Sequence, residues 1–244
     1  MAKAVSGSQN PPSSSLKYTW SVPDYIRSVE NSSHPLMKSY EQAEIDYISS
    51  IPDLSRKTVI DIGAGYGRVL PHIAPPRTRN IIAVEINDSM FSELQQRANQ
   101  YPNATALKGD ANELSELLAD IDVVSPVLMC LQNSLGTWEG DYKKALEEMG
   151  KVAKEKKGEV IISAWRGEQF KDYAMDIYTA LSPVVGVPDP IQSDFENGIF
   201  RSKTGYLSKW WSPAEREEIL RILGGRKINE ILDTPFFILH VAYN

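Results

Sequence analysis

The sequence predicts an α/β protein built around a parallel sheet, and the order of its segments carries that prediction. Short apolar runs, most of them rich in Val and Ile, recur at 58–63, 80–86, 104–110, 122–129 and 159–165. Amphipathic segments with helical spacing lie between them, at 67–74, 88–100, 111–119 and 141–154. Strands that alternate with helices in this way form parallel sheets covered by helices on both faces.

The residues before and after this alternation predict a tail, a helix and a C-terminal part with another order of helices and strands. Residues 1–16 are polar and rich in Pro and Ser, which predicts a disordered tail. Residues 18–35 show no clear period, and residues 36–51 have apolar side chains at helical spacing. After the last apolar run we expect a helix over about 167–181.

The C-terminal part predicts a hairpin, a capped helix and two strands. The hairpin is expected around 195–211, with its turn near 197–198 or 204–205. Ser212 and Glu215 have the spacing of a capping box, and a glycine pair at 224–225 ends the helix that follows. The segments KINEIL and FFILHVAY are expected to form antiparallel strands at the sheet edge.

Composition excludes several classes of protein. The chain has 244 residues, 42% of them hydrophobic and 24% charged, with one cysteine and three histidines. A single cysteine forms no internal disulfide, and so few Cys and His residues argue against a metal site. The net charge of -6 leads us to expect no nucleic-acid partner. With no signal sequence and no long apolar run, we expect a cytoplasmic protein with no membrane partner.

The segment VIDIGAGYGR carries the clearest functional signal. Asp61 ends an apolar run, and Gly63, Gly65 and Gly67 follow before the next helix. Glycines permit a positive φ and let a ligand approach the backbone closely, although a tight turn alone would also use them. Arg68 stands where a dinucleotide-binding fingerprint needs its third glycine. The loop therefore suits a ligand with a zwitterionic tail better than a pyrophosphate.

Two further strand ends bear acidic residues. Glu85 ends the second run, where a carboxylate can accept hydrogen bonds from both hydroxyls of a ribose, and Ile86 beside it can pack on an adenine. Asp110 and Ala111 follow the third run. Because the carboxyl ends of parallel strands share one edge of a sheet, these side chains are expected to lie along one rim.

The motifs VIDIGAGYGR, VEIND and ALKGDANEL, in this order, resemble those of the class I S-adenosylmethionine-dependent methyltransferases over about residues 38–165. The resemblance implies a three-layer Rossmann-like fold with a seven-stranded, mostly parallel sheet and an antiparallel last strand. It implies S-adenosyl-L-methionine as cofactor and S-adenosyl-L-homocysteine as product. It also implies one domain over 17–244, made of an N-terminal lid (17–52), a cofactor core (53–165) and an acceptor-side cover (166–244).

The resemblance also implies roles for individual residues. The methionine part of the cofactor would contact the glycine loop, the ribose would contact Glu85, and the adenine would contact the third strand end. The full set of expected cofactor-binding residues is Asp61, Gly63, Ala64, Gly65, Gly67, Arg68, Glu85, Ile86, Asp110, Ala111, Met129, Cys130 and Leu131.

The acceptor side is less well marked. Gln132, Asn133 and Ser134 follow the fourth run and are expected to position the acceptor, although the same residues also suit helix capping and turns. A lid or pocket wall is expected from the aromatic residues Tyr18, Trp20, Tyr25, Trp210 and Trp211, for which ordinary packing is the alternative. His34 and His240 are candidate bases for a hydroxyl acceptor, and structural histidines otherwise.

These observations predict a methyltransferase that acts on a small molecule or peptide, at an amine nitrogen. A neutral amine attacks a sulfonium methyl group directly, whereas a hydroxyl needs a base. The alternatives within the fold are a hydroxyl acceptor, a protein or an RNA. A protein that binds the cofactor without catalysis is the alternative from another class. The sequence does not determine the oligomeric state.

Overall fold

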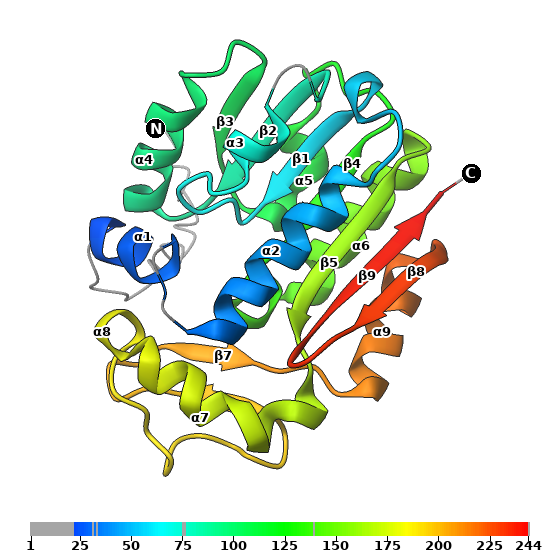
Figure 1. The fold of residues 1–244 in the computed structure, drawn as a ribbon. Coiled ribbons are helices and arrows are strands. Elements are labelled where there is room, and N and C mark those ends of the chain that lie inside the picture. The colour runs from blue at the N-terminus through cyan, green and yellow to red at the C-terminus, as the bar shows by residue number, and fades with distance from the viewer. Residues whose placement is uncertain (1–21, 31, 33, 75–76, 139, 244) are drawn as a thin grey trace, which may run out of the picture.

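The computed structural model describes residues 22–243, apart from positions 31, 33, 75–76 and 139. Its centre is a seven-stranded sheet (Figure 1). In spatial order the strands are β3 (Ala104–Lys108), β2 (Asn80–Glu85), β1 (Thr58–Ile62), β4 (Val127–Cys130), β5 (Glu159–Trp165), β9 (Phe236–Ala242) and β8 (Arg226–Leu232).

The first five strands of this order are parallel, and β9 is antiparallel to both of its neighbours. The sheet therefore confirms the predicted seven-stranded, mostly parallel fold with an antiparallel last strand. β9 lies inside the sheet, between β5 and β8, so β8 alone forms that edge.

Nine α-helices are found in the described part of the chain. They are α1 (Val22–Glu30), α2 (Pro35–Ser49), α3 (Leu70–Ile73), α4 (Asp88–Ala98), α5 (Leu114–Leu117), α6 (Tyr142–Glu155), α7 (Phe170–Ala180), α8 (Ser182–Val185) and α9 (Pro213–Leu223). None of these described helices is long and apolar enough to cross a membrane.

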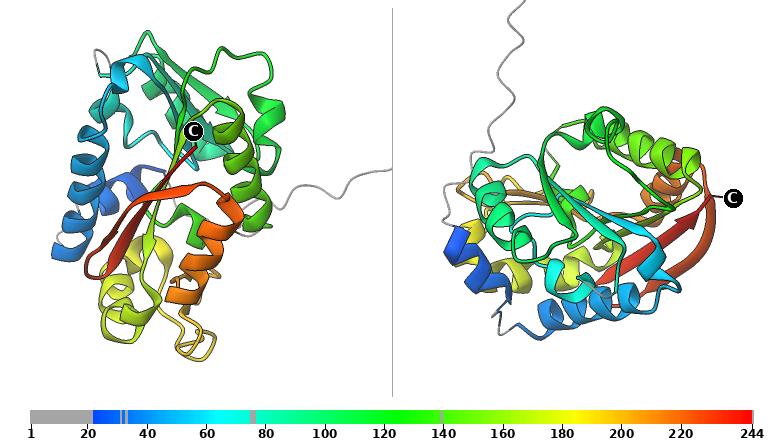
Figure 2. Two further views of the ribbon diagram at one scale, coloured as in Figure 1. Left: turned by 90° about the vertical axis from the view of Figure 1, so that its right-hand side faces the viewer. Right: turned by 90° about the horizontal axis from the view of Figure 1, so that it is seen from above.

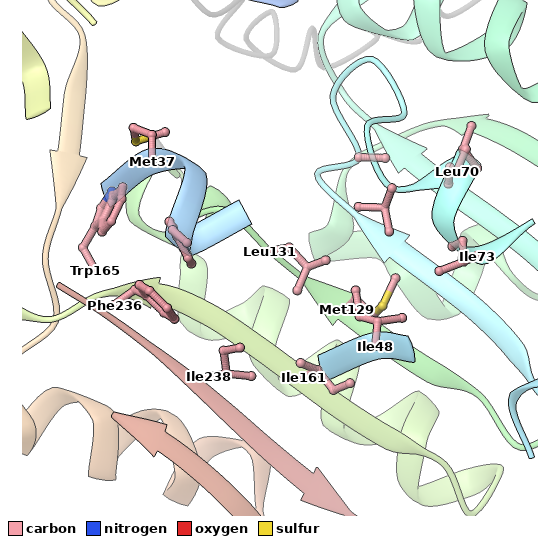
Figure 3. Close-up of a cluster of buried hydrophobic side chains, with 14 of the residues drawn as sticks. Met37, Ile48, Leu70, Ile73, Met129, Leu131, Ile161, Trp165, Phe236 and Ile238 are labelled. Carbon is pink, nitrogen blue, oxygen red and sulfur yellow. The ribbon is translucent and has the colours of Figure 1, made fainter. Parts of the chain in front are cut away.

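Alternating side chains of the buried strands supply two separate cores, as expected for a sheet covered on both faces. On one face, Met129 and Ile161 pack in a cluster with Ile48 of α2 (Figure 3). The same cluster includes side chains of α3, α4 and α7. On the other face, Leu128 and Ile162 pack with α5, α6 and α9. Figure 2 shows the sheet between these two layers of helices.

Several element boundaries differ from the sequence prediction for identifiable reasons. β4 begins at Val127 rather than at 122, since Pro126 cannot donate a ladder hydrogen bond and Ser125 has a φ of 41°. α3 has only four residues because the glycine turn continues to its start. α1 was not predicted, although Val22, Tyr25, Ile26 and Val29 have helical spacing.

The C-terminal predictions are confirmed in more detail. The strands β6 (Ile199–Arg201) and β7 (Leu207–Lys209) form the expected hairpin, with its turn at the second of the two positions considered. Ser212 and Glu215 form the capping box of α9, and Gly224 ends that helix with a φ of 70°. The hairpin, α7 and α8 lie beyond the carboxyl ends of the parallel strands, and α1 lies against α8 (Figure 1).

Candidate functional site

The glycine loop after β1 is fixed to the end of β2 by backbone hydrogen bonds. The N–H groups of Gly63 and Ala64 both donate to the Val84 carbonyl, at 3.0 Å. The N–H of Gly65 donates to Oε2 of Glu85 at 2.8 Å. The loop and the acidic strand end that the sequence predicted on one rim are therefore in direct contact.

All three glycines of the loop have positive φ, yet their surroundings differ. A Cβ on Gly67 would lie 2.8 Å from Leu70 and 2.9 Å from Leu94, so this position is closed by packing. A Cβ on Gly65, where φ is 56°, would meet no atom within 4 Å. Gly65 thus exposes its backbone to open space, which is what a closely bound ligand requires.

The carboxylate of Glu85 is buried at the end of β2, with 7% of the residue exposed. Besides Gly65, it accepts a hydrogen bond from the N–H of Asn87 at 2.7 Å. Burial raises the pKa of Glu85, and the backbone donors oppose that shift. Ile86, the next residue, is 45% exposed and so presents an apolar surface beside the loop.

The third strand end lies on the same rim. The Asp110 side chain accepts a hydrogen bond from the N–H of Asn112 at 2.9 Å and caps the short helical turn that begins with Ala111. Ala111 is buried. Asp110 and Ala111 follow β3, and β3 lies next to β2, the strand that ends at Glu85.

A buried ion pair that the sequence did not reveal lies beneath the glycine loop. Arg68 donates to Glu44 of α2 and lies 3.5 Å from Glu41. Arg68 is 6% exposed and Glu44 is 1% exposed. Glu44 has helical spacing from the buried Tyr40 and Ile48, so its place on the apolar face of α2 was the available signal.

Asp61 lies in the same cluster. It is 3% exposed, and burial raises its pKa to about 7 against the opposing effect of Arg68. No residue in the described part of the chain hydrogen-bonds to its carboxylate. Asp61 is therefore a buried acid with no hydrogen-bonding partner among the described residues, close to the glycine loop.

The segment after β4 has an unusual backbone. Gln132 and Asn133 have φ values of 50° and 56°, in the left-handed region that non-glycine residues rarely adopt. The N–H of Gln132 donates to Glu44 at 2.6 Å, and that of Asn133 donates to the Tyr40 hydroxyl at 3.0 Å. α2 thus holds two strained residues in place, and such strain is concentrated at functional sites.

The three predicted acceptor-facing residues differ in their side-chain contacts. The amide of Asn133 donates to Ser208 at 2.9 Å and accepts from the Trp165 N–H at 3.3 Å, so it joins β5 to β7. Ser134 donates to the Gly63 carbonyl at 3.4 Å. Gln132 lines both of the hollows described next, whereas Asn133 lines only one of them and Ser134 only the other.

Two adjacent hollows open on this rim. The glycine-loop pocket, of about 350 Å³ with its open mouth included, is lined by residues such as Asp61, Gly65, Arg68, Leu131 and Ser134. The apolar pocket, of about 450 Å³ measured in the same way, has Trp165, Tyr178 and Leu181 in its wall. Tyr25 and Gln132 line both, so the two pockets meet at these residues.

The predicted aromatic residues have different positions. Tyr25 of α1 lies at the boundary of the two pockets, whereas Tyr18 and Trp20 lie outside the described residues. Trp210 is fully buried behind the apolar pocket, where it stacks on Trp165 with ring centroids 5.2 Å apart. Trp211 packs in the core on the opposite face of the sheet.

The remaining candidates lie in the core or away from the pockets. Met129 and Cys130 are fully buried in β4, and burial raises the pKa of Cys130 to about 12. His34 contacts Asp176 at 3.0 Å, and His240 bonds to Tyr47 and Glu159. Neither histidine lines either pocket. Within the described residues, no cluster of His, Cys, Asp and Glu could hold a metal ion.

Comparison with known proteins agrees with this arrangement. Residues 59–156 match a family described as Methyltransferase domain. A segment of 74 residues is 36% identical to the ribosomal RNA small subunit methyltransferase A of Koribacter versatilis (strain Ellin345). That segment is 30% of this chain and about a quarter (26%) of the relative's length.

Two solved structures share the fold. An S-adenosylmethionine-dependent methyltransferase from Clostridium acetobutylicum ATCC 824 superposes with a TM-score of 0.60 at 14% identity, over 91% of this chain and 97% of the other. Magnesium protoporphyrin IX methyltransferase from Synechocystis PCC 6803, solved with S-adenosylhomocysteine, gives a TM-score of 0.60 at 13% identity over 91% and 93%. At sequence identities this low, the structural similarity shows a shared fold.

The seven-stranded sheet has the Rossmann-like methyltransferase fold that these solved structures share. Residues 59–156 match the methyltransferase-domain family, and the magnesium protoporphyrin IX methyltransferase of this fold has also been solved with S-adenosylmethionine bound. The glycine-loop pocket suits this cofactor in two respects. Open space faces the Gly65 backbone, and the buried Tyr66 hydroxyl in the pocket wall has no hydrogen-bond partner among the described residues.

Proposed function

We propose that the protein transfers the methyl group of S-adenosylmethionine to an amine nitrogen of a small-molecule acceptor. The observation that carries this proposal is the pair of pockets that meet at Tyr25 and Gln132. A cofactor in the glycine-loop pocket and an acceptor in the apolar pocket would face each other across this boundary. In-line transfer needs this alignment of two reactants and the exclusion of water.

We assign the cofactor contacts residue by residue. Glu85 accepts hydrogen bonds from the ribose hydroxyls, since its two oxygens have accepting capacity beyond their backbone donors. Asp61 pairs with the amino group of the methionine part, because its buried carboxylate lacks another donor. The remaining N–H groups of Arg68 face the carboxylate of that part. Ile86, Asp110 and Ala111 border the adenine.

The charges around the glycine loop favour a cationic ligand. The buried carboxylates of Glu44 and Asp61 and the half-buried one of Glu41 lie near the guanidinium of Arg68, and the buried carboxylate of Glu85 holds the loop at Gly65. When bound, S-adenosylmethionine supplies an electrophilic methyl group on a positively charged sulfur. Because charges interact strongly in a buried site, the excess of carboxylates stabilises this cofactor relative to its product, which lacks the sulfonium charge.

Calorimetric titration with S-adenosylmethionine tests the cofactor assignment. Glu85→Ala removes two charge-assisted hydrogen bonds, each worth about 1.5–3 kcal/mol, and should weaken binding about 100-fold or more. Glu116→Ala, which removes an exposed glutamate outside both pockets, should bind normally. Thermal unfolding of each variant separates lost binding from lost folding. Unchanged affinity in a folded Glu85→Ala variant contradicts the ribose assignment.

Release of S-adenosylhomocysteine in the presence of small amines, peptides, alcohols and RNA tests the reaction itself. RNA is the second candidate because the curated relative is a ribosomal RNA methyltransferase. Binding of RNA with a steep negative dependence on salt would favour that acceptor, whereas the net charge of -6 argues for small molecules. Tight cofactor binding with no transfer to any acceptor would favour a protein that binds without catalysis.

A further inference from the structure

The apolar pocket has a wall of rings and aliphatic side chains drawn from distant parts of the chain. Tyr25 comes from α1, Trp165 from the end of β5, Tyr178 from α7 and Tyr206 from the segment before β7. The aliphatic part includes Val184 of α8. In Figure 3, Trp165 lies next to the first turn of α2. Four aromatic rings around one hollow form a surface suited to a flat, apolar molecule.

The rings of this wall are held rigidly by their neighbours. Trp165 lies between Tyr40 and Trp210, with ring centroids at 4.5 and 5.2 Å. Tyr178 stacks on Phe200 at 3.8 Å, and its hydroxyl donates to Ser208 at 2.5 Å. The wall is therefore built before any ligand enters. A rigid apolar wall favours a rigid ligand, which loses little conformational entropy on binding.

Charged groups are absent from the described residues that line this pocket. The polar members of its lining are the side chains of Ser28, Gln132 and Asn133 and the tyrosine phenols. Burial raises the pKa of Tyr25 to about 12 and also raises that of Tyr178, so both phenols stay protonated at neutral pH. No described group in this lining can take up a proton there, and none can neutralise a charge on a ligand.

These properties restrict which nucleophiles can react in the pocket. An aliphatic amine is protonated at neutral pH, and its ammonium would enter a low-dielectric pocket whose described lining offers no counter-ion. A hydroxyl would need a base to become a sufficient nucleophile. An anion such as a phosphate would find no cation among the described residues of this lining. The amino nitrogen of an aromatic or weakly basic heteroaromatic amine is neutral at this pH and keeps a lone pair that can attack.

We propose that the apolar pocket binds an uncharged aromatic or heteroaromatic amine and presents its nitrogen at the boundary marked by Tyr25 and Gln132. This inference rests on the proposed function. The nitrogen lone pair forms the new bond to the methyl carbon while the carbon–sulfur bond breaks and its electron pair stays on sulfur. A proton on the nitrogen then leaves to water, so the protein need not supply a base.

Three probes with the same bicyclic skeleton test this substrate class: naphthylamine, aminodecalin and naphthol. Initial rates are measured at pH 7 with S-adenosylmethionine saturating. We expect naphthylamine to be methylated at least about tenfold faster than either of the others. Its rate should change little between pH 7 and 9, whereas a rate limited by deprotonation of an ammonium would rise about tenfold per pH unit.

A charge placed in the pocket provides a second test. Ser28→Asp adds a carboxylate to the lining and should shift the ratio of rates toward aminodecalin by about tenfold or more. Ser89→Asp, on the exposed face of α4 and outside both pockets, is the matched control and should leave this ratio unchanged. Titration with S-adenosylmethionine checks that both variants still bind the cofactor.

The outcomes separate this inference from the proposed function. Equal or faster methylation of aminodecalin or naphthol overturns the inference and leaves a methyltransferase for small molecules in place. If none of the three probes is methylated while other small amines react, the inference is likewise overturned and the proposed function stands. If the cofactor binds and no small amine of any kind reacts, both the inference and the proposed function are overturned.

Discussion

Replacement of Gly65 by alanine tests whether a ligand approaches the glycine loop from the open side. A Cβ at this position meets no protein atom within 4 Å, so it causes no clash in the free protein. It projects instead into the space that the proposed cofactor would occupy. We therefore expect Gly65→Ala to weaken S-adenosylmethionine binding far more than it weakens folding.

The structure gives the size of each effect. With φ at 56°, an alanine at this position costs about 1–2 kcal/mol of folding free energy. For a chain of this length, each kcal/mol lowers Tm by roughly 2–4 °C. An added methyl group that holds the cofactor away from the backbone should cost at least about 1.4 kcal/mol of binding, which is a tenfold rise in Kd.

Gly205 offers a matched control. It also has a positive φ, of 92°, and open space around its missing Cβ, yet it lies in the turn of the β6–β7 hairpin and lines neither pocket. Gly205→Ala should lower Tm by a similar amount and leave Kd unchanged. Calorimetry and thermal unfolding measure both quantities. Equal Kd values for Gly65→Ala and Gly205→Ala would refute the close approach of the cofactor to the loop.

Three further changes have distinct expected outcomes. Glu44→Gln breaks the buried pair with Arg68 and should lower the free energy of unfolding by about 3–5 kcal/mol in urea titrations. Because the pKa of Asp61 is raised to about 7, its carboxylate forms as pH rises from 6 to 8, and affinity for S-adenosylmethionine should rise over this range. Asp61→Asn should bind weakly with no such dependence. Gly67→Ala adds a Cβ within 2.9 Å of two leucines and should cost about 2–4 kcal/mol of stability.

Controls accompany these measurements. Asp122→Asn breaks an exposed pair with Arg79 and should cost less than about 1 kcal/mol, which sets the scale for Glu44→Gln. If Glu44→Gln lowers the free energy of unfolding only slightly, the buried ion pair contributes little to stability. An Asp61→Asn variant that keeps the pH dependence of binding would assign it to another group. A Gly67→Ala variant as stable as the wild type would mean that the leucines rearrange freely.

Local patterns predicted the sheet well, because each strand, turn and cap is encoded by neighbouring residues. The short apolar runs located five of the seven strands of the sheet, and Ser212 with Glu215 located the start of α9. The glycine loop and Glu85 were found in the same way, and they prove to be in contact. Sequence order alone was sufficient for these features.

Local sequence patterns could not predict the features that depend on contacts between distant parts of the chain. Glu44 has the position of a core residue on an amphipathic helix, and only the fold brings Arg68 and the Gln132 N–H to it. The wall of the apolar pocket also depends on distant contacts, because Trp165 and Tyr178 become neighbours only when α7 folds over the end of β5. The prediction named the adjacent Trp210, which lies one layer deeper.

The position of β9 has a consequence for the order in which the chain can fold. β8 is made before β9, but within the sheet it pairs with β9 alone. A growing chain emerges from its N-terminus, so β8 has no partner strand in this sheet until residues 236–242 are available. Until then the outer edge of β5, the strand that carries Trp165, also stays unpaired. Assembly of the acceptor side is thus completed late in synthesis, after the whole cofactor half of the sheet has been made.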